Sequence, residues 1–173
     1  MNKKSVKSSL RYSVVEGSLW ALMYGLGENF LSALSVFLGY SALQISILNS
    51  FPQLIGSFLQ LLSNNLLKIV RSTKKFVVYL AFIQSILWIC LIYILIYNPK
   101  FYYLLCWFII YFLCNSLIGP VWTSWMGFLV PRRIRGKYYG SRNRIINSFI
   151  LVSILLGGFI LKIFADDPLS GFL

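Results

Sequence analysis

Five long apolar runs limit what this chain can fold into more than any other feature. A helix needs about 20 mostly apolar residues to cross the hydrocarbon core of a bilayer, and each run is long enough. The runs cover residues 17–40, 41–67, 76–97, 101–130 and 145–164. Lipid offers no partner to backbone polar groups, and no run alternates apolar with polar residues, so we expect helices rather than barrel strands.

The runs predict an all-α integral membrane protein with five transmembrane helices in one bundle, residues 17–164. Residues 1–16 are expected to form a tail and residues 165–173 an outer loop. The composition agrees with this class, because 58% of the residues are hydrophobic and only 12% are charged. A soluble domain carries about 25% charged residues. A soluble enzyme, a disordered tail and a disulfide scaffold are therefore excluded.

The distribution of Lys and Arg predicts the orientation. Four of them precede the first run, four lie between the second and third runs, and six lie between the fourth and fifth runs. The opposite side has only Lys100 and Lys162. Since cytoplasmic loops retain Lys and Arg, we expect a multi-pass protein of the cytoplasmic membrane. Its N-terminus lies inside, and the end of the segment lies outside.

The closing residues suggest a chain that continues. Asp166-Asp167-Pro168 is typical of an outer loop, and Gly171-Phe172-Leu173 is typical of the first turn of another apolar helix. We expect a fragment that is cut before a sixth span. The alternative is a genuine five-span protein with a short outer tail.

The residue types argue against catalysis. The chain has no His, which removes the commonest general base and metal ligand. Its three cysteines lie inside apolar runs without the spacing of a metal site or a disulfide framework, as small hydrophobic residues do. They are Cys90, Cys106 and Cys114. We expect no enzyme, no catalytic residue, no metal and no cofactor.

Glu28 is the only acidic residue within a run. A charge near the bilayer centre costs about 2.5–3.5 kcal/mol, so a proton, a polar partner or a wet cavity must offset the cost. At helical spacing Glu28 shares a face with Tyr24. One interpretation is a carboxylate that couples protons or contacts substrate. The other is a protonated glutamic acid bonded to an amide of a neighbouring helix.

Further polar residues recur at helical spacing along the second, third and fourth runs. Single amides of this kind commonly join helices, at roughly 0.6 kcal/mol each. For the set as a whole we favour a polar central cavity. The candidate residues of a substrate or proton pathway are Glu28, Tyr24, Asn49, Gln53, Gln60, Gln84, Asn115 and Trp122. Pro52 and Pro120 are expected to kink their helices.

The basic loop after the fourth run is a candidate gate and topology signal. Its residues of interest are Arg132, Arg133, Arg135, Gly136, Arg142 and Arg144. We expect contact with anionic headgroups. A short loop between two spans offers too little surface for nucleic acid, and its glycines lack the spacing of a phosphate-binding loop.

The same region carries a resemblance to a known family. Residues 119–131 read GPVWTSWMGFLVP and residues 135–144 read RGKYYGSRNR. Together they resemble a fourth-helix and loop signature, roughly GPxWxSWMGDLVPxxxRGRYFGxRNR, of a prokaryotic branch of the major facilitator superfamily. Two departures stand out. Phe128 occupies the acidic position of that signature, and the loop around Lys74-Lys75 lacks the family's acidic residue and glycine.

The resemblance implies twelve spans in two six-helix halves, with alternating access to a central site. The chain would then be the N-terminal segment of a secondary transporter for an unknown small solute. Proton coupling is one option that the carboxylate of Glu28 leaves open. Its partners would be the lipid bilayer, the solute and the C-terminal half, with no nucleic acid. The alternative is a stand-alone five-span interaction or assembly protein without transport activity.

Overall fold

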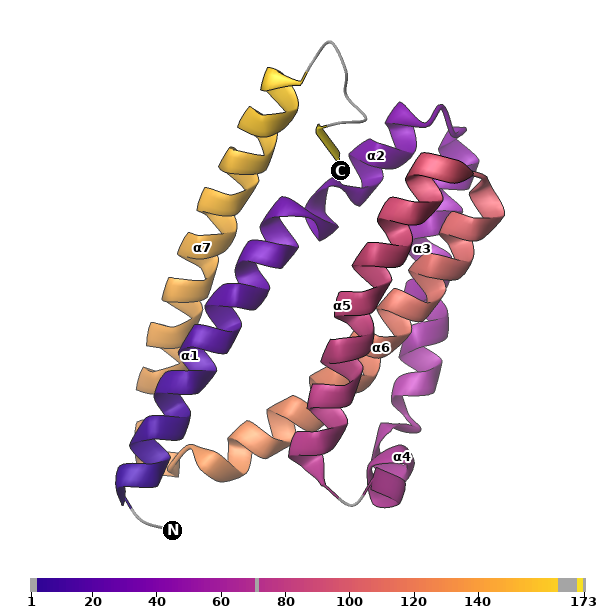
Figure 1. Ribbon diagram of the computed structural model, residues 1–173. Coiled ribbons are helices and arrows are strands. Elements are labelled where there is room, and N and C mark those ends of the chain that lie inside the picture. Colours follow the sequence, from indigo (N-terminus) through magenta and orange to yellow (C-terminus); the bar gives the residue numbers. More distant parts are fainter. Residues whose placement is uncertain (1–2, 71, 165–170, 173) are drawn as a thin grey trace. The chain divides into compact units, whose positions relative to one another are not determined.

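The computed structural model describes residues 3–70, 72–164 and 171–172. Every element in these ranges is a helix, which confirms the prediction of an all-α protein (Figure 1). The elements are α1 (Lys3–Leu26), η1 (Glu28–Phe30), α2 (Leu31–Phe37), α3 (Ala42–Gln60), α4 (Ser63–Val70), α5 (Thr73–Tyr97), α6 (Phe101–Leu129), η2 (Arg132–Ile134) and α7 (Arg135–Ile163). Arg71 and most of the expected outer loop, residues 165–170 and 173, lie outside the described residues.

Three helical stretches of the described chain are long and apolar enough to cross a membrane. They are Thr73–Tyr97, Phe101–Leu129 and Arg132–Ile163. They correspond to the third, fourth and fifth predicted runs, so the chain has the helices of a membrane-associated protein. Two of these helices begin earlier than the predicted runs. α5 begins at Thr73 rather than at residue 76, and α7 begins at Arg135 rather than at residue 145.

The first two runs are not continuous helices. The run 17–40 is divided where α1 ends at Leu26 and the 3-10 turn η1 follows. Gly27 and Asn29, both weak helix formers, flank Glu28 at this break. The run 41–67 is divided between α3 and α4, just before Ser63 and two asparagines. Short polar side chains of this kind compete for backbone hydrogen bonds and favour a new helix start.

The basic segment after α6 is helical rather than an irregular loop. Pro131 ends the preceding helix, the short turn η2 follows, and α7 begins at Arg135. Most of the predicted gate residues therefore lie on the first turns of a long helix. Its polar start extends the apolar part of α7 by about 10 residues, or roughly 15 Å at the usual helical rise.

The chain forms two compact units. One contains the described residues up to 37 and from 127 onward, and the other contains residues 38–126. Each is described by itself.

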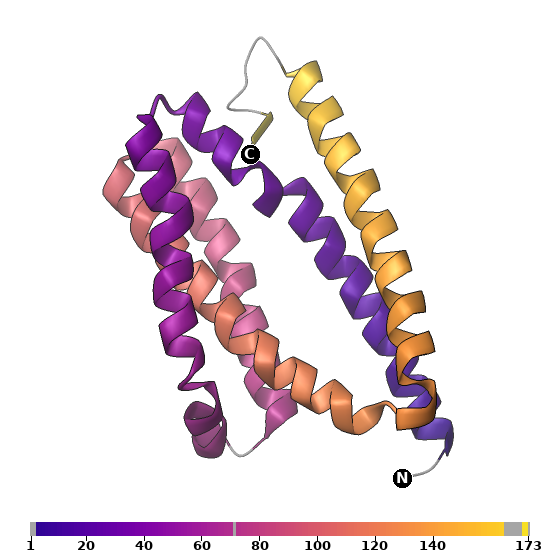
Figure 2. The ribbon, with the colours of Figure 1, turned by 180° about the vertical axis from the view of Figure 1, so that it is seen from behind.

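In the first unit, α1 and α7 lie side by side and run parallel (Figures 1 and 2). Contacts along the pair keep one register. Near the start, Tyr138 donates a hydrogen bond to the carbonyl of Leu10 at 3.2 Å, and further along Gly157 packs on the ring of Phe30. The seam of α1 uses small residues four apart, all of them buried. They are Ser13, Gly17, Ala21 and Gly25. Small residues let helix backbones approach closely in membranes.

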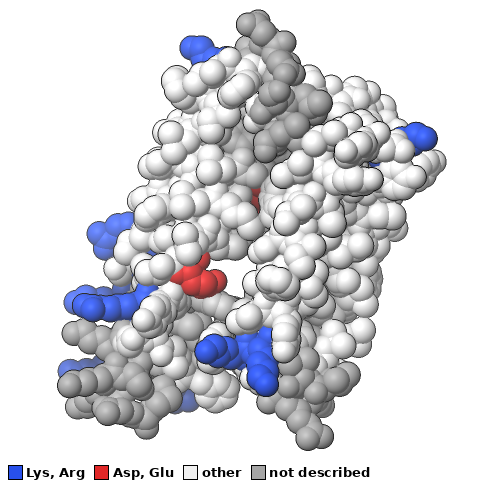
Figure 3. All heavy atoms as spheres, in the orientation of Figure 1, with Lys and Arg blue, Asp and Glu red and all other residues white. Residues whose placement is uncertain are grey.

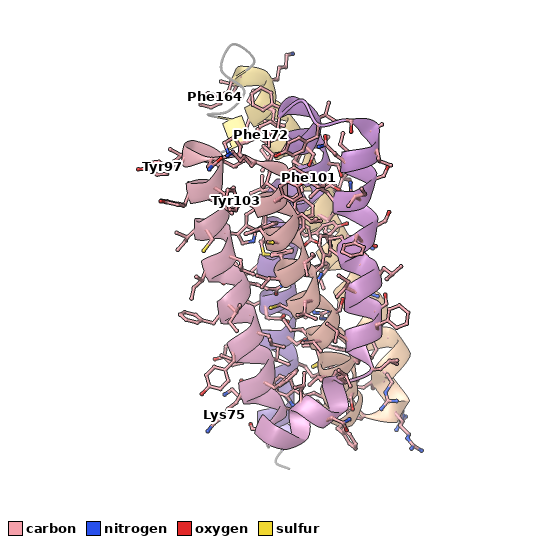
Figure 4. All side chains as sticks on the ribbon, turned by 90° about the vertical axis from the view of Figure 1, so that its right-hand side faces the viewer. Lys75, Tyr97, Phe101, Tyr103, Phe164 and Phe172 are labelled. Carbon is pink, nitrogen blue, oxygen red and sulfur yellow. The ribbon has the colours of Figure 1, made fainter. Side chains whose placement is uncertain are left out.

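In the second unit, α5 and α6 run antiparallel and are joined by the short Asn98–Lys100 turn. Figure 4 shows Lys75 and Tyr97 at the two ends of α5, with Phe101 and Tyr103 near the Tyr97 end. The hydroxyl of Tyr40 donates to the carbonyl of Pro99 at 2.6 Å, which fixes the turn before α3 to this connection.

The middle of the α5–α6 pair is held by aromatic rings and two hydrogen bonds. Trp107 stacks on Tyr111 with ring centroids 4.9 Å apart, and Trp88 meets both rings edge-on at 5.7 Å. The indole of Trp107 donates to the carbonyl of Leu87. The side chain of Gln84 donates to the carbonyl of Tyr111 at 3.4 Å. These contacts bury Gln84, while Ser85 and the lysines at the start of α5 remain exposed.

Candidate functional site

An open pocket of about 670 Å³, with polar side chains in its lining, lies in the second unit between the end of α3 and the second half of α6. Its lining consists of Gln60, Asn115, Ser116, Gly119, Pro120, Thr123 and Ser124. The volume falls within the roughly 300–1,000 Å³ of small-molecule sites. None of these lining residues is charged and none is aromatic, although the helices that carry them are strongly apolar.

Close packing of α3 and α6 positions one wall of this pocket. A Cβ atom added at Gly56 would overlap the hydroxyl of Ser116 and would lie 3.2 Å from its Cβ and 3.4 Å from the carbonyl oxygen of Phe112. A larger residue here would force the Ser116 hydroxyl to rotate and its Cβ to move by a few tenths of an ångström. The contact places Ser116 beside α3, one helical turn before Gln60 along the α3 axis.

Gly119 and Pro120 leave space on the α6 side of the pocket. A Cβ at Gly119 would meet nothing within 4 Å, so the missing side chain leaves space. Pro120 has no N–H, and the carbonyl of Ser116, four residues earlier, loses its usual helical donor. The hydroxyl of Thr123 donates to the carbonyl of Gly119 at 2.8 Å. The helix thus offers the pocket a backbone acceptor in addition to side-chain groups.

The polar side chains of the lining are largely free. None of the hydrogen bonds within the described chain uses the side chains of Gln60, Asn115, Ser116 or Ser124. Each carboxamide can donate two hydrogen bonds and accept two, and each hydroxyl can donate one and accept two. Unpaired groups of this kind are costly in a dry apolar setting, so the pocket favours water or a polar ligand.

The sequence-predicted pathway residues fall into separate places. Gln60 and Asn115 meet in the pocket. Gln84 is buried and acts as a link between α5 and α6, while Asn49 bonds to the carbonyl of Ile45 in its own helix at 2.9 Å. Gln53 is exposed on α3. Ser116, Thr123 and Ser124 were not predicted as site residues, although their spacing from Asn115 on one helix was a usable signal.

Three further candidates lie outside the pocket lining. Glu28 begins the turn η1 and is half-buried. Tyr24 stacks on Trp20, with ring centroids 5.2 Å apart. Because α1 ends at Leu26, Glu28 does not continue the helical face of Tyr24. Trp122 is half-buried on α6 but is not among the lining residues.

Two arginines of the basic segment hold helix ends together. Arg135 donates to the carbonyls of Gly127 and Val130 at the end of α6, the latter at 3.3 Å. Phe128, at the acidic position of the resembled signature, is 89% exposed. The arginine therefore binds backbone carbonyls where the signature would offer a carboxylate. Favourable contact between a cation and the C-terminal end of a helix is expected from the helix dipole.

Arg142 joins α7 to α1. Its side chain is only 11% exposed, donates to the carbonyl of Ser13 at 3.3 Å and lies 3.6 Å from the carboxylate of Glu16. Burial raises the pKa of Glu16, and the charge of Arg142 lowers it in part. The glutamate side chain is 56% exposed, so the pair is worth little by itself. Figure 3 shows that basic atoms are more widespread than acidic atoms on one face of the described chain.

The other residues of the basic segment, Arg132, Arg133, Gly136 and Arg144, are exposed. Their charges are available to headgroups. Among the described residues, no group of three or more Cys, Asp or Glu side chains is placed to hold a metal ion.

Comparisons with known protein families, curated proteins and solved structures give no significant match to this chain.

Proposed function

We propose that this chain forms part of the N-terminal half of a secondary transporter of the major facilitator type. Its α3–α6 pocket would be one wall of the path through which a small solute passes by alternating access. The single observation that carries the proposal is this pocket of about 670 Å³. Unpaired amides and hydroxyls on apolar helices are costly against lipid, and a hydrated solute path removes that cost.

The resemblance supports the same assignment from the sequence. Four lining residues fall inside the 119–131 stretch on which the resemblance rests: Gly119, Pro120, Thr123 and Ser124. The geometry of the pocket does not depend on that resemblance. The pocket and the resemblance therefore involve the same segment of α6. The opposite wall would come from the C-terminal half of the transporter.

Access from both sides of the membrane tests the proposal. Cys90, Cys106 and Cys114 are replaced by Ala, and Asn115→Cys is introduced at the middle of α6. Right-side-out and inside-out vesicles are then treated with a membrane-impermeant methanethiosulfonate. A transporter exposes the thiol in turn to each side, so labelling from both sides is expected. Ile110→Cys, on an exposed apolar position of the same helix, is the matched control.

Labelling of Asn115→Cys from one side only, or from neither, contradicts transport through this pocket. That result would favour the second function considered, a membrane interaction or assembly protein. The control stays unlabelled when it faces lipid, because the thiolate that reacts with the reagent forms only in water.

A further inference from the structure

The chemistry of the lining limits the ligand more narrowly than transport alone requires. We propose that the α3–α6 pocket binds an uncharged, hydroxyl-rich solute of the polyol or sugar class. This inference rests on the proposed function, since the same pocket would be the solute path. It follows from the charge, the hydrogen-bonding groups and the shape of the lining.

Charge is the first limit. The seven lining residues include no Lys, Arg, Asp or Glu. An ion that leaves water for a site among apolar helices needs an opposite charge to offset its desolvation. None of the described lining residues supplies one. A neutral solute avoids this cost.

Hydrogen bonding is the second limit. The side chains of Gln60 and Asn115 each present donors and acceptors, and the hydroxyls of Ser116 and Ser124 do the same. The carbonyl of Ser116 adds an acceptor, because Pro120 supplies it with no N–H. An apolar ligand would leave all of these groups unpaired. A ligand rich in hydroxyl groups can satisfy both kinds, since each hydroxyl both donates and accepts.

The absence of rings from the lining is the third limit. No Phe, Tyr or Trp is among the lining residues, although aromatics make up 17% of the chain. A nucleobase or another flat aromatic ligand commonly stacks on such rings. Recognition by this wall therefore depends on hydrogen bonds along the ligand rather than on ring stacking.

A protection assay tests the ligand class. In the background without native cysteines, Ser124→Cys replaces a pocket hydroxyl by a thiol of similar shape. The labelling rate with methanethiosulfonate is measured with glucose, with sorbitol, with gluconate and with glucosamine. The four probes have related skeletons and differ in ring closure or charge. We expect glucose or sorbitol at saturation to slow labelling at least fivefold, and the two charged probes to leave the rate unchanged.

Three variants strengthen the assay. Gly119→Leu places a side chain in open space of the pocket, so protection should be lost without a packing clash. Gly127→Leu, also on α6 and also with open space around its Cβ, is the matched control and should keep protection. Asn115→Asp adds an anion to the lining, so glucosamine should then protect better than glucose does.

The outcomes separate the two claims. Equal or stronger protection by gluconate or glucosamine in the Ser124→Cys protein that retains Asn115 overturns the ligand class, and so does the absence of protection by both neutral probes. Either result leaves two-sided labelling of Asn115→Cys, and with it the transporter, untouched. One-sided labelling combined with protection by a neutral probe would instead mean a binding site without transport.

Discussion

Replacement of Gly25 by Ala is expected to loosen the packing of α1 on α7. The added Cβ would overlap the Cβ of Ser153 and would lie 3.0 Å from the carbonyl oxygen of Ile150 and 3.3 Å from the amide nitrogen of Ile154. These atoms belong to the backbone of α7 or are fixed to it, so the helices must move apart. Overpacking of this kind costs about 1–3 kcal/mol. The better helix propensity of Ala returns about 0.5–1 kcal/mol.

The expected net loss of unfolding free energy, worked from those two terms, is therefore about 0–2.5 kcal/mol, with about 1 kcal/mol at the middle of both ranges. Alanine substitutions at two other glycines serve as comparisons with smaller expected losses. At Gly17 the added Cβ would meet the ends of the Arg142 and Ile146 side chains at 2.6 and 2.7 Å, which can swing away, so Gly17→Ala should cost less. At Gly158 it would meet nothing within 4 Å, so Gly158→Ala should be neutral or slightly stabilising.

The assay is equilibrium unfolding in mixed dodecylmaltoside and dodecyl sulfate micelles, followed by far-ultraviolet circular dichroism. Ser153→Gly combined with Gly25→Ala removes the closest contact and should restore part of the loss. Equal midpoints for Gly25→Ala and Gly158→Ala would refute the close approach of the two helices at this point.

Three further predictions concern charge. Reporter fusions at Lys75 and Arg135 should lie in the cytoplasm and a fusion at Pro99 outside; an external reporter at Arg135 would overturn the orientation. Arg142→Gln should raise the pKa of Glu16 further above its usual value, as NMR titration of the carboxyl can measure, whereas the exposed Arg144→Gln should leave it unchanged. Because this pKa is raised, the protonated form is favoured in the fold, and stability should fall as pH rises from about 4.5 through the pKa of the folded state, over a wider range in Arg142→Gln. Glu28→Gln should abolish or uncouple solute uptake while membrane insertion stays normal; unchanged uptake at every pH would leave Glu28 a packing residue.

The long apolar helices could be predicted closely from the sequence. The runs 101–130 and 76–97 match α6 and α5 within a few residues, because an uninterrupted apolar run has one low-energy conformation in lipid. The break at Gly27–Glu28 was not predicted. The sequence predicts one span that continues through Glu28 and Asn29, whereas α1 ends before them at Leu26. Local propensity decided the conformation there.

The sequence patterns did not predict which helices pack against each other. Periodicity identified polar faces on the second and fourth runs, and thus Gln60 and Asn115, but it did not say which faces meet. The approach of α3 to α6 depends on Gly56 fitting against Ser116. A glycine in an apolar run is compatible with many packing partners, so its role appears only once the second helix is in place.

None of the lining residues of the pocket is charged, so the charged residues of the sequence do not mark its position. Glu28 is a candidate site residue because a carboxylate in an apolar run is costly. The pocket depends instead on groups that two of its residues lack. Gly119 lacks a side chain and so leaves volume, and Pro120 lacks an N–H and so frees a carbonyl. The side chains of Gln60, Asn115, Ser116 and Ser124 then find no partner within the described chain. Polarity without charge is what a neutral solute needs, and it comes from residue types that sequence patterns assign to kinks and helix contacts.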